Sequence, residues 1–220
     1  MSIELSYCVV NTEQRQLLSY CLDAIARERA AVDFETETLV LDNASTDGSA
    51  DAARAHSVTT DVIALESRRE KGENTTELLR HSRGRFCLLL NGDSELEPGA
   101  TAALHAALAA TDGAGAAGAT LVSPDGDQQP SAWRFPNAVT ALLSLVGGLK
   151  RRFVEQSHGA QVRDVDWTPV AALLVRREPA VAVGWQDSDE VGFCRALHDA
   201  GWRVLYVPDA RAVSHDRVAP

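Results

Sequence analysis

The sequence predicts an α/β fold in which a mostly parallel mixed sheet is flanked by helices. Strand-like apolar segments alternate with segments of helical periodicity through residues 1–122. Residues 86–90 form a continuous apolar run, which is typical of a strand buried on both faces of a helix-covered parallel sheet. The chain is 45% apolar, which is enough to supply a full core. This alternation implies parallel strands joined by crossover helices.

Each element is predicted from local signals. Apolar runs bounded by polar or glycine-containing turns predict strands at 3–10, 37–41, 62–65, 86–90, 116–122, 170–175 and 203–207. Helical spacing or a helix-starting proline predicts helices at 14–29, 50–55, 77–82, 98–110, 138–149 and 190–200. Residues 150–164 are expected to form a mobile polar connection, and the residues after 207 a tail. The sequence has no internal repeat or composition shift, which favours one domain over 1–220.

The composition argues against several classes of protein. The formal charge of -10, from 21 basic and 31 acidic residues, argues against nonspecific nucleic-acid binding and against a polybasic membrane patch. No apolar run reaches transmembrane length, and the first residues lack the pattern of a signal peptide. The cysteines are scattered without a CxxC pair, so we expect buried thiols in a reducing, cytoplasmic compartment rather than a zinc site. These are Cys8, Cys21, Cys87 and Cys194.

Polar residues follow the apolar run 86–90 directly. In open α/β sheets, ligands bind in the crevice beyond the carboxyl ends of the strands, so chemistry is expected here. Asn91 and Asp93 could both turn an oxygen toward one hard cation, Mg²⁺ or Mn²⁺, while a diphosphate supplies further ligands. The alternative is a polar turn that leads into the helix starting at Pro98.

A second polar turn follows the strand expected at 37–41. Its Asp-Asn-Ala-Ser-Thr-Asp-Gly sequence at 42–48 fails the pattern of a calcium-binding EF-hand loop, because Ala44 and Thr46 occupy ligand positions. Asp42 could instead accept hydrogen bonds from a nucleobase or ribose. The turn also suits a helix cap provided by Ser45, Thr46 or Asp47.

These segments, taken in order, resemble the family-two glycosyltransferases. The first two are Asp-Asn-Ala-Ser-Thr-Asp-Gly-Ser at 42–49 and Leu-Leu-Leu-Asn-Gly-Asp-Ser-Glu-Leu at 88–96. The resemblance continues through Ala-Ala-Leu-Leu-Val-Arg-Arg at 171–177, Val-Gly-Trp at 183–185, the run 193–208 and Ala-Val-Ser-His at 212–215. It covers nearly the whole chain and looks most like the rhamnosyltransferase-like branch, whose metal motif is Asn-x-Asp.

The resemblance implies a fold and a reaction. The fold would be the single-domain nucleotide-sugar transferase fold of the GT-A type, with residues 1–122 as the nucleotide-sugar-binding half and 123–220 as the acceptor-side half. Family members transfer a sugar from a nucleoside diphosphate to an acceptor with inversion, usually with Mg²⁺ or Mn²⁺. The partners would be a nucleoside-diphosphate sugar and a small-molecule, lipid-linked or glycan acceptor; a homodimer stays open.

The resemblance also assigns roles to residues. Asp42 would contact the base, and Asn11 and Glu13 would lie in the floor of the nucleoside site. Apart from the resemblance, Arg68, Arg69 or Lys71 could steer the diphosphate, with a solvated charge run as the alternative for at least two of them. The nucleotide-binding residues are then Asn11, Glu13, Asp42, Asn43, Ser45, Lys71 and Gly72. Asp93 would hold the metal with Asn91, and His215 matches a late histidine that approaches the metal or diphosphate. Alone, His215 would be a solvated tail residue.

The acceptor hydroxyl must lose a proton as the glycosidic bond forms, so a carboxylate is expected as general base. By resemblance, Glu190 falls on the base position, and Asp189 and Asp187 are neighbouring candidates. Acids favoured at a helix N-terminus are the alternative. The loop before Glu190 is shorter than in the family, which leaves the choice of base open. Trp133, Arg134 and Trp185 are assigned to the acceptor side.

Two other functions compete with glycosyl transfer. A nucleotidyltransferase also uses a parallel sheet, a metal and acids at strand ends, but it would normally carry a glycine-rich basic loop after the first strand. Residues 11–16 lack those glycines. A noncatalytic nucleotide-binding relative that has lost its acceptor loop is the other alternative.

Overall fold

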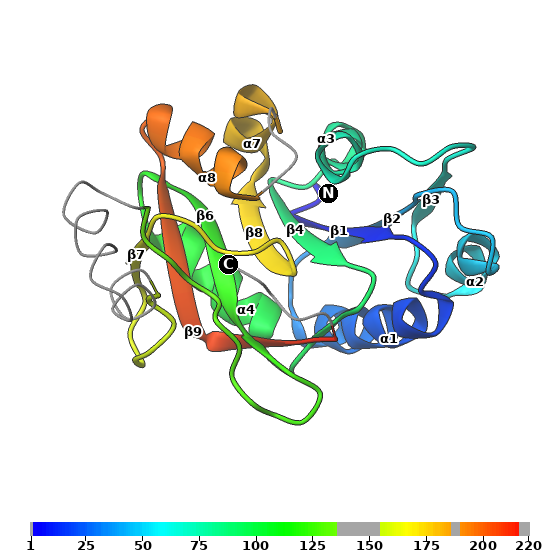
Figure 1. The fold of residues 1–220 in the computed structure, drawn as a ribbon, viewed down its shortest axis with the longest axis horizontal. Coiled ribbons are helices and arrows are strands. Elements are labelled where there is room, and N and C mark those ends of the chain that lie inside the picture. The colour runs from blue at the N-terminus through cyan, green and yellow to red at the C-terminus, as the bar shows by residue number, and fades with distance from the viewer. Residues whose placement is uncertain (1, 136–154, 186–189, 216–220) are drawn as a thin grey trace, which may run out of the picture.

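The strand predicted at 86–90 lies in the middle of one mixed sheet (Figure 1). The structure is a computed structural model that describes residues 2–135, 155–185 and 190–215. The strands are β1 Leu5–Asn11, β2 Thr36–Asp42, β3 Asp61–Ala64, β4 Phe86–Asn91, β5 Ser94–Leu96, β6 Ala114–Val122, β7 Arg163–Val165, β8 Ala172–Arg176 and β9 Arg203–Ser214. The helices are α1 Arg15–Ala31, α2 Ser49–Ala55, α3 Lys71–His81, α4 Ala100–Ala110, α7 Arg177–Val183 and α8 Glu190–Asp199.

The sheet has a parallel half and a half of mixed direction. Its order is β3-β2-β1-β4-β8-β6-β9-β5, and β7 pairs with β9 outside this path. Strands β3, β2, β1 and β4 are parallel to their neighbours, as expected for strands joined by crossover helices. Strand β8 then runs antiparallel to both β4 and β6, whereas β6 and β9 are parallel. The predicted mixed α/β sheet is therefore confirmed, with its parallel part concentrated in the N-terminal half.

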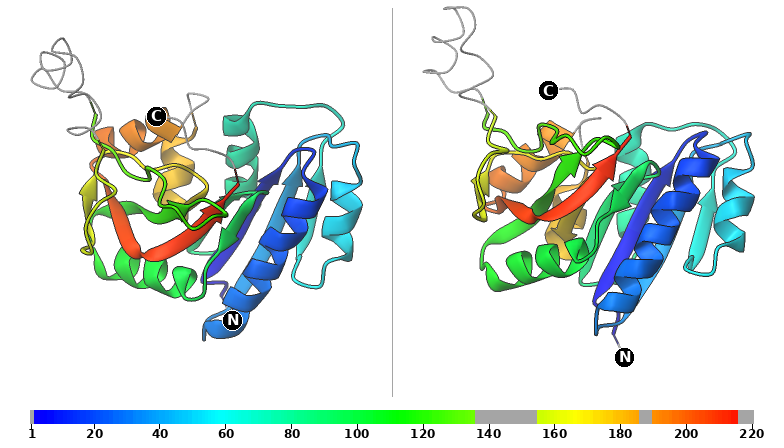
Figure 2. Two further views of the ribbon diagram at one scale, coloured as in Figure 1. Left: turned by 60° about the horizontal axis from the view of Figure 1, so that its bottom comes forward. Right: turned by 90° about the horizontal axis from the view of Figure 1, so that it is seen from below.

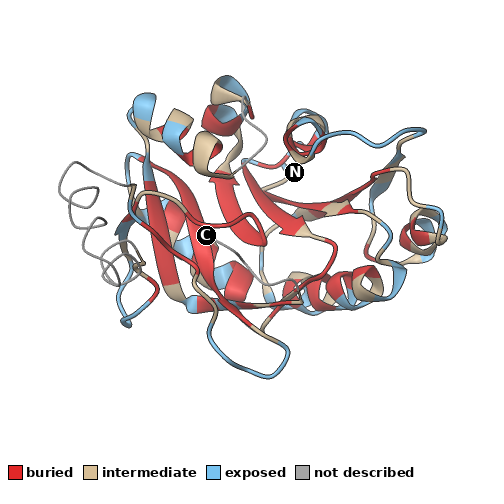
Figure 3. Ribbon diagram, in the orientation of Figure 1, coloured by how far each residue is buried: buried red, intermediate tan, exposed pale blue. Residues whose placement is uncertain are grey.

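Helices cover both faces of the sheet and enclose a core on each side. Buried residues of α1, α2 and α4 pack with one set of strand residues, which includes Leu88 and Leu90. Buried residues of α3, α7 and α8 pack with the opposite set, which includes Cys87 and Leu89. Figure 1 and the two views in Figure 2 show this division into layers. The alternation along β4 explains why its sequence is a continuous apolar run: both faces are buried (Figure 3).

One helix begins earlier than predicted. Helix α3 starts at Lys71, not at about Glu77, because Glu70 forms a capping box with Glu73. The backbone N–H of Glu70 donates to Glu73 Oε2 at 3.2 Å. A glutamate at the cap is a weaker sequence signal than the usual serine or threonine, so the prediction missed this first turn.

The C-terminal strand is longer than predicted. Strand β9 continues to Ser214 instead of ending near Val207, so the expected tail from 208 is partly strand. Its last residues pair with the short strand β5, and its first part pairs with β7. Strands β5 and β7 and helix α7 were not predicted.

Several other expectations can be placed. All four cysteines are buried thiols, as predicted. Among the described residues, no helix is both long and apolar enough to span a membrane. The helix expected at 138–149 lies outside the described residues. Of the expected connection 150–164, the described part ends in β7.

Candidate functional site

Three neighbouring parallel strands end in polar residues at one edge of the sheet. The register pairs Asn11 of β1 with Asp42 of β2, and Val10 with Asn91 of β4. Gly92 follows at the same edge, where an added Cβ would lie 2.6 Å from Asn11 Oδ1. The close approach of Asn11 therefore requires glycine at position 92. Residues expected from three separate motifs thus lie side by side.

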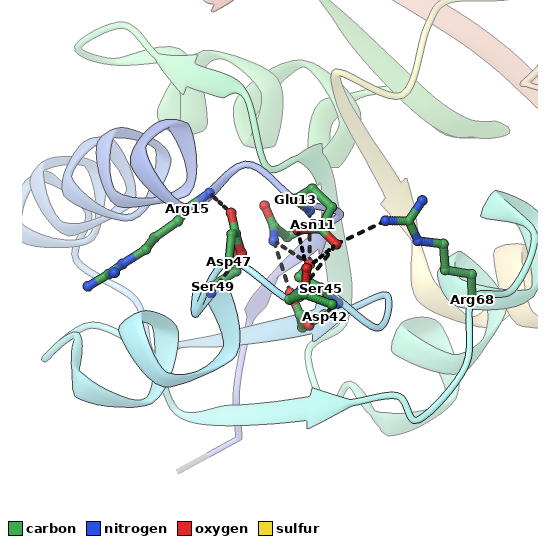
Figure 4. A network of polar contacts seen from close by, with 9 residues as sticks. Asn11, Glu13, Arg15, Asp42, Ser45, Asp47, Ser49 and Arg68 are labelled. Carbon is green, nitrogen blue, oxygen red and sulfur yellow. Dashed lines mark hydrogen bonds and ion pairs between the residues drawn. The ribbon is translucent and has the colours of Figure 1, made fainter.

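Asn11 and Asp42 form a buried polar network with Ser45 (Figure 4). Asn11 Nδ2 donates to Asp42 Oδ1 at 3.0 Å and to Ser45 Oγ at 3.4 Å. The backbone N–H of Ser45 donates to Asp42 Oδ2 at 3.0 Å. Each carboxylate oxygen of Asp42 still has a lone pair for another donor. Asn11 Oδ1 is buried and has no hydrogen-bond partner among the described residues, which marks an unfilled polar position in this network.

Glu13 ties three segments together above this network. Its carboxylate accepts hydrogen bonds from the backbone N–H of Thr46 at 3.0 Å and from Arg68 at 3.0 Å. Its own N–H donates to Ser45 Oγ at 2.9 Å. Glu13 and Ala44 both have a φ of 54°, an uncommon backbone conformation for residues with side chains. The ends of β1 and β2 are therefore held in strained conformations by the same set of contacts.

The turn after β2 also organises the start of α2. The N-cap of α2 is Gly48, so the cap predicted at Ser45, Thr46 or Asp47 is wrong. Asp47, the residue before it, accepts hydrogen bonds from the N–H of Ser49 at 3.0 Å and of Arg15 at 2.8 Å. Burial opposes the shift, but hydrogen bonds from the Ser49 hydroxyl and from the N–H groups of Arg15 and Ser49 hold the pKa of Asp47 below its ordinary value. The starts of α1 and α2 are thereby joined beside the network.

Asn43 links Asp42 to the start of α3. Its side-chain amide donates to the carbonyl of Arg69 at 3.1 Å and accepts from the N–H of Arg69 at 2.8 Å. Lys71 and the buried Gly72 form the start of α3. They directly follow this loop, which Asn43 fixes to the turn after β2. Asn43 thus positions a loop, and both hydrogen-bonding groups of its amide are used for that.

Two of the three residues predicted to hold a metal, Asp93 and His215, lie next to the pairing of β5 with β9. These strands pair in an antiparallel register with Ser94 opposite Ser214. Asp93 directly precedes Ser94 and His215 directly follows Ser214, so both lie next to this end of the pairing. Asp93 is buried with 1% of its surface exposed, and Asn91 is the last residue of β4. His215 is part-buried beside the sheet rather than a solvated tail residue, so that alternative is wrong.

Glu95 is a further residue of this region that the sequence did not single out. Its Oε1 lies 2.8 Å from His215 Nε2. Burial raises the pKa of the Cys21 thiol, and the negative charges of Asp93 and Glu95 raise it further. The Cys21 thiol contacts the carbonyl of Asn91 at 3.8 Å. In the described part of the chain, no three His, Cys, Asp or Glu side chains are arranged to hold a metal ion.

The expected base contacts a residue from the expected nucleotide site. Glu190 is the first residue of α8, and its Oε1 lies 2.6 Å from Lys71 Nζ. The two side chains come from opposite halves of the chain. Asp187 and Asp189 lie outside the described residues.

The three residues assigned to the acceptor side differ in exposure. Trp133 is buried, and its ring stacks on Trp167 with centroids 4.0 Å apart. Trp185 is also buried and stacks on Phe193 at 4.2 Å, which leaves little of either indole to contact an acceptor. Arg134 is exposed and lies 3.7 Å from Asp166.

Comparisons with known proteins give the family of the chain. The family model described as glycosyl transferase family 2 matches residues 6–168. A search of the curated proteins found no match.

Solved structures share the fold at low sequence identity. A mannosyltransferase from Pyrobaculum calidifontis, in complex with GDP-Man and Mn²⁺, aligns with a TM-score of 0.67 and 18% identity over 98% of this chain and 57% of that chain. GalNAc-T7 with UDP, GalNAc and Mn²⁺ aligns with a TM-score of 0.70 and 13% identity over 99% of this chain and 44% of that chain. Staphylococcus aureus TarS 1-349, in complex with UDP-GlcNAc, aligns with a TM-score of 0.67 and 15% identity over 99% of this chain and 60% of that chain.

This chain therefore spans only 44% to 60% of the length of these three structures. They establish the fold of the chain, which is the GT-A fold. The match to the family model covers well over half of the sequence. The chain belongs to glycosyl transferase family 2.

Proposed function

We propose that this protein transfers a sugar from a nucleoside-diphosphate sugar to an acceptor hydroxyl with inversion of configuration. The observation that carries the proposal is the set of polar residues on three adjacent strand ends, with Asn11 and Asp42 beside Asn91 and Asp93. An open α/β sheet binds its ligands at this edge. Family membership and neighbours that hold nucleotide sugars support the same conclusion.

The nucleoside would bind over β1 and β2. Asp42 can accept hydrogen bonds from the base or ribose, and Asn11 Oδ1 is a buried acceptor without a partner in the described structure. A ligand N–H or O–H that reached Asn11 would complete the network. Glu13, Ser45 and Asn43 shape this position through the turn after β2 and the loop before α3.

A divalent cation, Mg²⁺ or Mn²⁺, would be held by Asp93 with Asn91 and His215. The oxygen donors fit, because a carboxylate and an amide oxygen suit a hard cation. Ser94 Oγ, next to Asp93, is buried with no partner among the described residues. When bound, the cation would neutralise the charge that develops on the leaving diphosphate. Two solved neighbours contain Mn²⁺, and the Asn-x-Asp order favours the rhamnosyltransferase-like branch.

Glu190 would act as the general base. The acceptor oxygen forms the new bond to the sugar carbon as the bond from that carbon to the phosphate oxygen breaks. The acceptor proton passes to the carboxylate, and the bonding electrons leave with the nucleoside diphosphate. Asp187 and Asp189 stay as candidates because they are neighbours of Glu190 in sequence. The acceptor would lie on the side of 123–220, where Arg134 is the exposed residue of the three assigned to it. All four cysteines are buried thiols, which supports a reducing compartment such as the cytoplasm.

Product analysis tests the proposal against its alternatives. Incubation with nucleotide sugars, Mn²⁺ and a panel of acceptors should release a nucleoside diphosphate. Release of pyrophosphate from a nucleoside triphosphate and a sugar phosphate would identify a nucleotidyltransferase instead. Nucleotide binding without turnover of any acceptor would support the noncatalytic alternative. A thermal-shift panel of nucleotide sugars with and without Mn²⁺ would select the donor first.

A substitution tests the base. Glu190→Gln should lower turnover by about 100-fold or more, because the amide cannot take the acceptor proton. If Glu190→Gln retains full turnover while Asp187→Asn or Asp189→Asn loses it, the base lies elsewhere in the loop. Full activity in all three variants would contradict this mechanism.

A further inference from the structure

The Lys71–Glu190 ion pair connects two parts of the site that the proposed function treats separately. Lys71 Nζ lies 2.6 Å from Glu190 Oε1, and the side chains are 35% and 23% exposed. Lys71 is the first residue of α3, and Glu190 is the first residue of α8. The pair therefore joins the start of α3, whose preceding loop is hydrogen bonded to the turn after β2 through Asn43, to the helix that carries the proposed base.

Helix stability explains the position of Glu190 but not that of Lys71. The N-terminal end of a helix carries a partial positive charge, so an acid is favoured in the first turn and a base is disfavoured. Glu190 in α8 follows this rule, as does Glu73 in the first turn of α3. Arg80 and His81 lie in the last turn of α3, where cations are favoured. Lys71, like Arg15 at the start of α1 and Arg177 at the start of α7, has the unfavourable placement, which a nearby anion offsets.

Two anions can offset the placement of Lys71: the carboxylate of Glu190 and the diphosphate of the proposed donor. Helix α3 follows β3 of the parallel half, so its N-terminus lies at the edge where the strands end. Asn43, which follows Asp42, holds both backbone groups of Arg69 by hydrogen bonds. Lys71 is thus two residues from Arg69, whose backbone is fixed to the turn that would bind the nucleoside.

We propose that Lys71 is a donor-sensitive latch on the catalytic base. Without a donor, Lys71 holds the Glu190 carboxylate; when the diphosphate arrives, Lys71 turns to it and releases an oxygen of Glu190 for the acceptor proton. The base therefore becomes available only after the donor is bound. This inference rests on the proposed function, since it takes the diphosphate as donor group and Glu190 as base. The step itself exchanges one ion pair for another and makes no covalent bond.

The exchange predicts an effect of Glu190 on nucleotide affinity that a merely structural ion pair would not produce. Because Lys71 must leave Glu190 to reach the diphosphate, Glu190→Gln should tighten nucleoside-diphosphate binding. The expected change is about two- to fivefold, the scale of an ion pair of this exposure. Lys71→Met should weaken the same binding, and Lys71→Arg should retain most of it.

The experiment is a double-mutant cycle by calorimetry. UDP, GDP and dTDP are titrated with Mn²⁺ into the wild-type chain, and the one that binds most tightly is used for all variants. In the Lys71→Met background, Glu190→Gln should have no further effect on affinity. Binding of the matching nucleoside, which lacks phosphate, should be the same in all variants. Asp164→Asn is the matched control, because it removes one charge from the ion pair with Arg203, on the β7–β9 pairing.

Each outcome supports or overturns the latch. Unchanged or weaker nucleotide binding in Glu190→Gln, or an equal gain in the Lys71→Met background, would overturn it while leaving the proposed function intact. If the wild-type chain releases no nucleoside diphosphate from any nucleotide sugar in the product analysis, the proposed function fails and the latch with it. Thermal unfolding checks each variant, and Glu190→Ala, expected to show the same gain, replaces Glu190→Gln if that variant is unfolded.

Discussion

Strands β1 and β2 carry a buried polar pair at each end, and the two pairs differ in how completely they are hydrogen bonded. Near the amino ends, Ser6 lies opposite Glu37 in the register; at the carboxyl ends, Asn11 lies opposite Asp42. Glu37 accepts hydrogen bonds from Ser6 Oγ at 2.6 Å, and from the backbone N–H and Nε of Arg83 at 2.7 and 2.8 Å. Asn11 Oδ1, by contrast, has no partner in the described structure.

The difference separates residues that stabilise the fold from residues that await a ligand. A buried carboxylate with several donors is a finished structural unit, whereas a buried amide oxygen without a donor costs free energy. The carboxyl ends also contain Glu13 and Ala44 with positive φ. Strain and an unfilled acceptor together are typical of a functional site that the rest of the fold holds in place.

The largest effect is expected at the carboxyl edge, from Asp93→Asn. The variant keeps the shape of the side chain but replaces a carboxylate with a neutral amide, which is a poor ligand for a hard cation. Mn²⁺-dependent affinity for a nucleoside diphosphate should fall about 100-fold or more. The melting temperature without ligand should change little. Equal Mn²⁺-dependent affinity in variant and wild type, by calorimetry, would show that Asp93 does not bind the metal.

The opposite pattern is expected at the amino ends, from Glu37→Gln. The new amide nitrogen would face donors of Ser6 and Arg83, so the free energy of unfolding should fall by about 2 kcal/mol. Nucleotide affinity should stay at the wild-type value. Urea unfolding measures the change, and Asp51→Asn is the control, since it breaks an exposed ion pair with Arg54 and should cost little. A loss of nucleotide binding in folded Glu37→Gln would contradict the assignment of a purely structural role to the amino ends of β1 and β2.

The sequence predicted the parallel half of the sheet and the meeting of its polar strand ends. Strands β1, β2 and β4 are apolar runs of strand length, and parallel strands that are neighbours end at one edge. Placing Asn11, Asp42 and Asn91 there needed no knowledge of contacts between distant segments.

The pairing of β5 with β9 could not be predicted in the same way. Strand β5 has three residues, too few to show the alternation of apolar and polar residues that indicates a strand. In the last part of β9 the buried positions are Ala210, Ala212 and Ser214, whose small side chains give almost no apolar signal. The contact between His215 and Glu95 depends on this pairing, so Glu95 was missed while His215 was found only by resemblance.

A smaller effect is expected for Asp42→Ala, which tests the ligand at the carboxyl ends. One charge-assisted hydrogen bond to the nucleoside would be lost, so affinity for the free nucleoside and for the nucleoside diphosphate should fall by a similar factor, roughly tenfold. Calorimetry with both ligands measures this. Asp47→Asn, in the same turn, should leave nucleoside affinity unchanged. A loss confined to diphosphate ligands would place Asp42 at the phosphates or the metal instead.

The smallest effect concerns pH and returns to Glu37. Burial alone would raise the pKa of Glu37, but hydrogen bonds from Ser6 and Arg83, with the charge of Arg83, hold it below its ordinary value. Because the folded-state pKa is the lower one, the unfolded chain binds the proton first. The stabilisation is therefore fully present above the unfolded pKa of about 4.3 and is lost as pH falls through the folded pKa.

Wild type should accordingly lose more stability than Glu37→Gln as the pH is lowered from about 7 to about 3. The free energies of unfolding of the two chains, plotted against pH, should therefore approach each other at the acid end. Asp47 has a lowered pKa as well, but it is present in both chains and cancels in the difference. Urea unfolding across this range gives the measurement. Parallel curves would mean that Glu37 gains nothing from its charge in the folded state. The amino ends of β1 and β2 would then be held by shape and neutral hydrogen bonds alone.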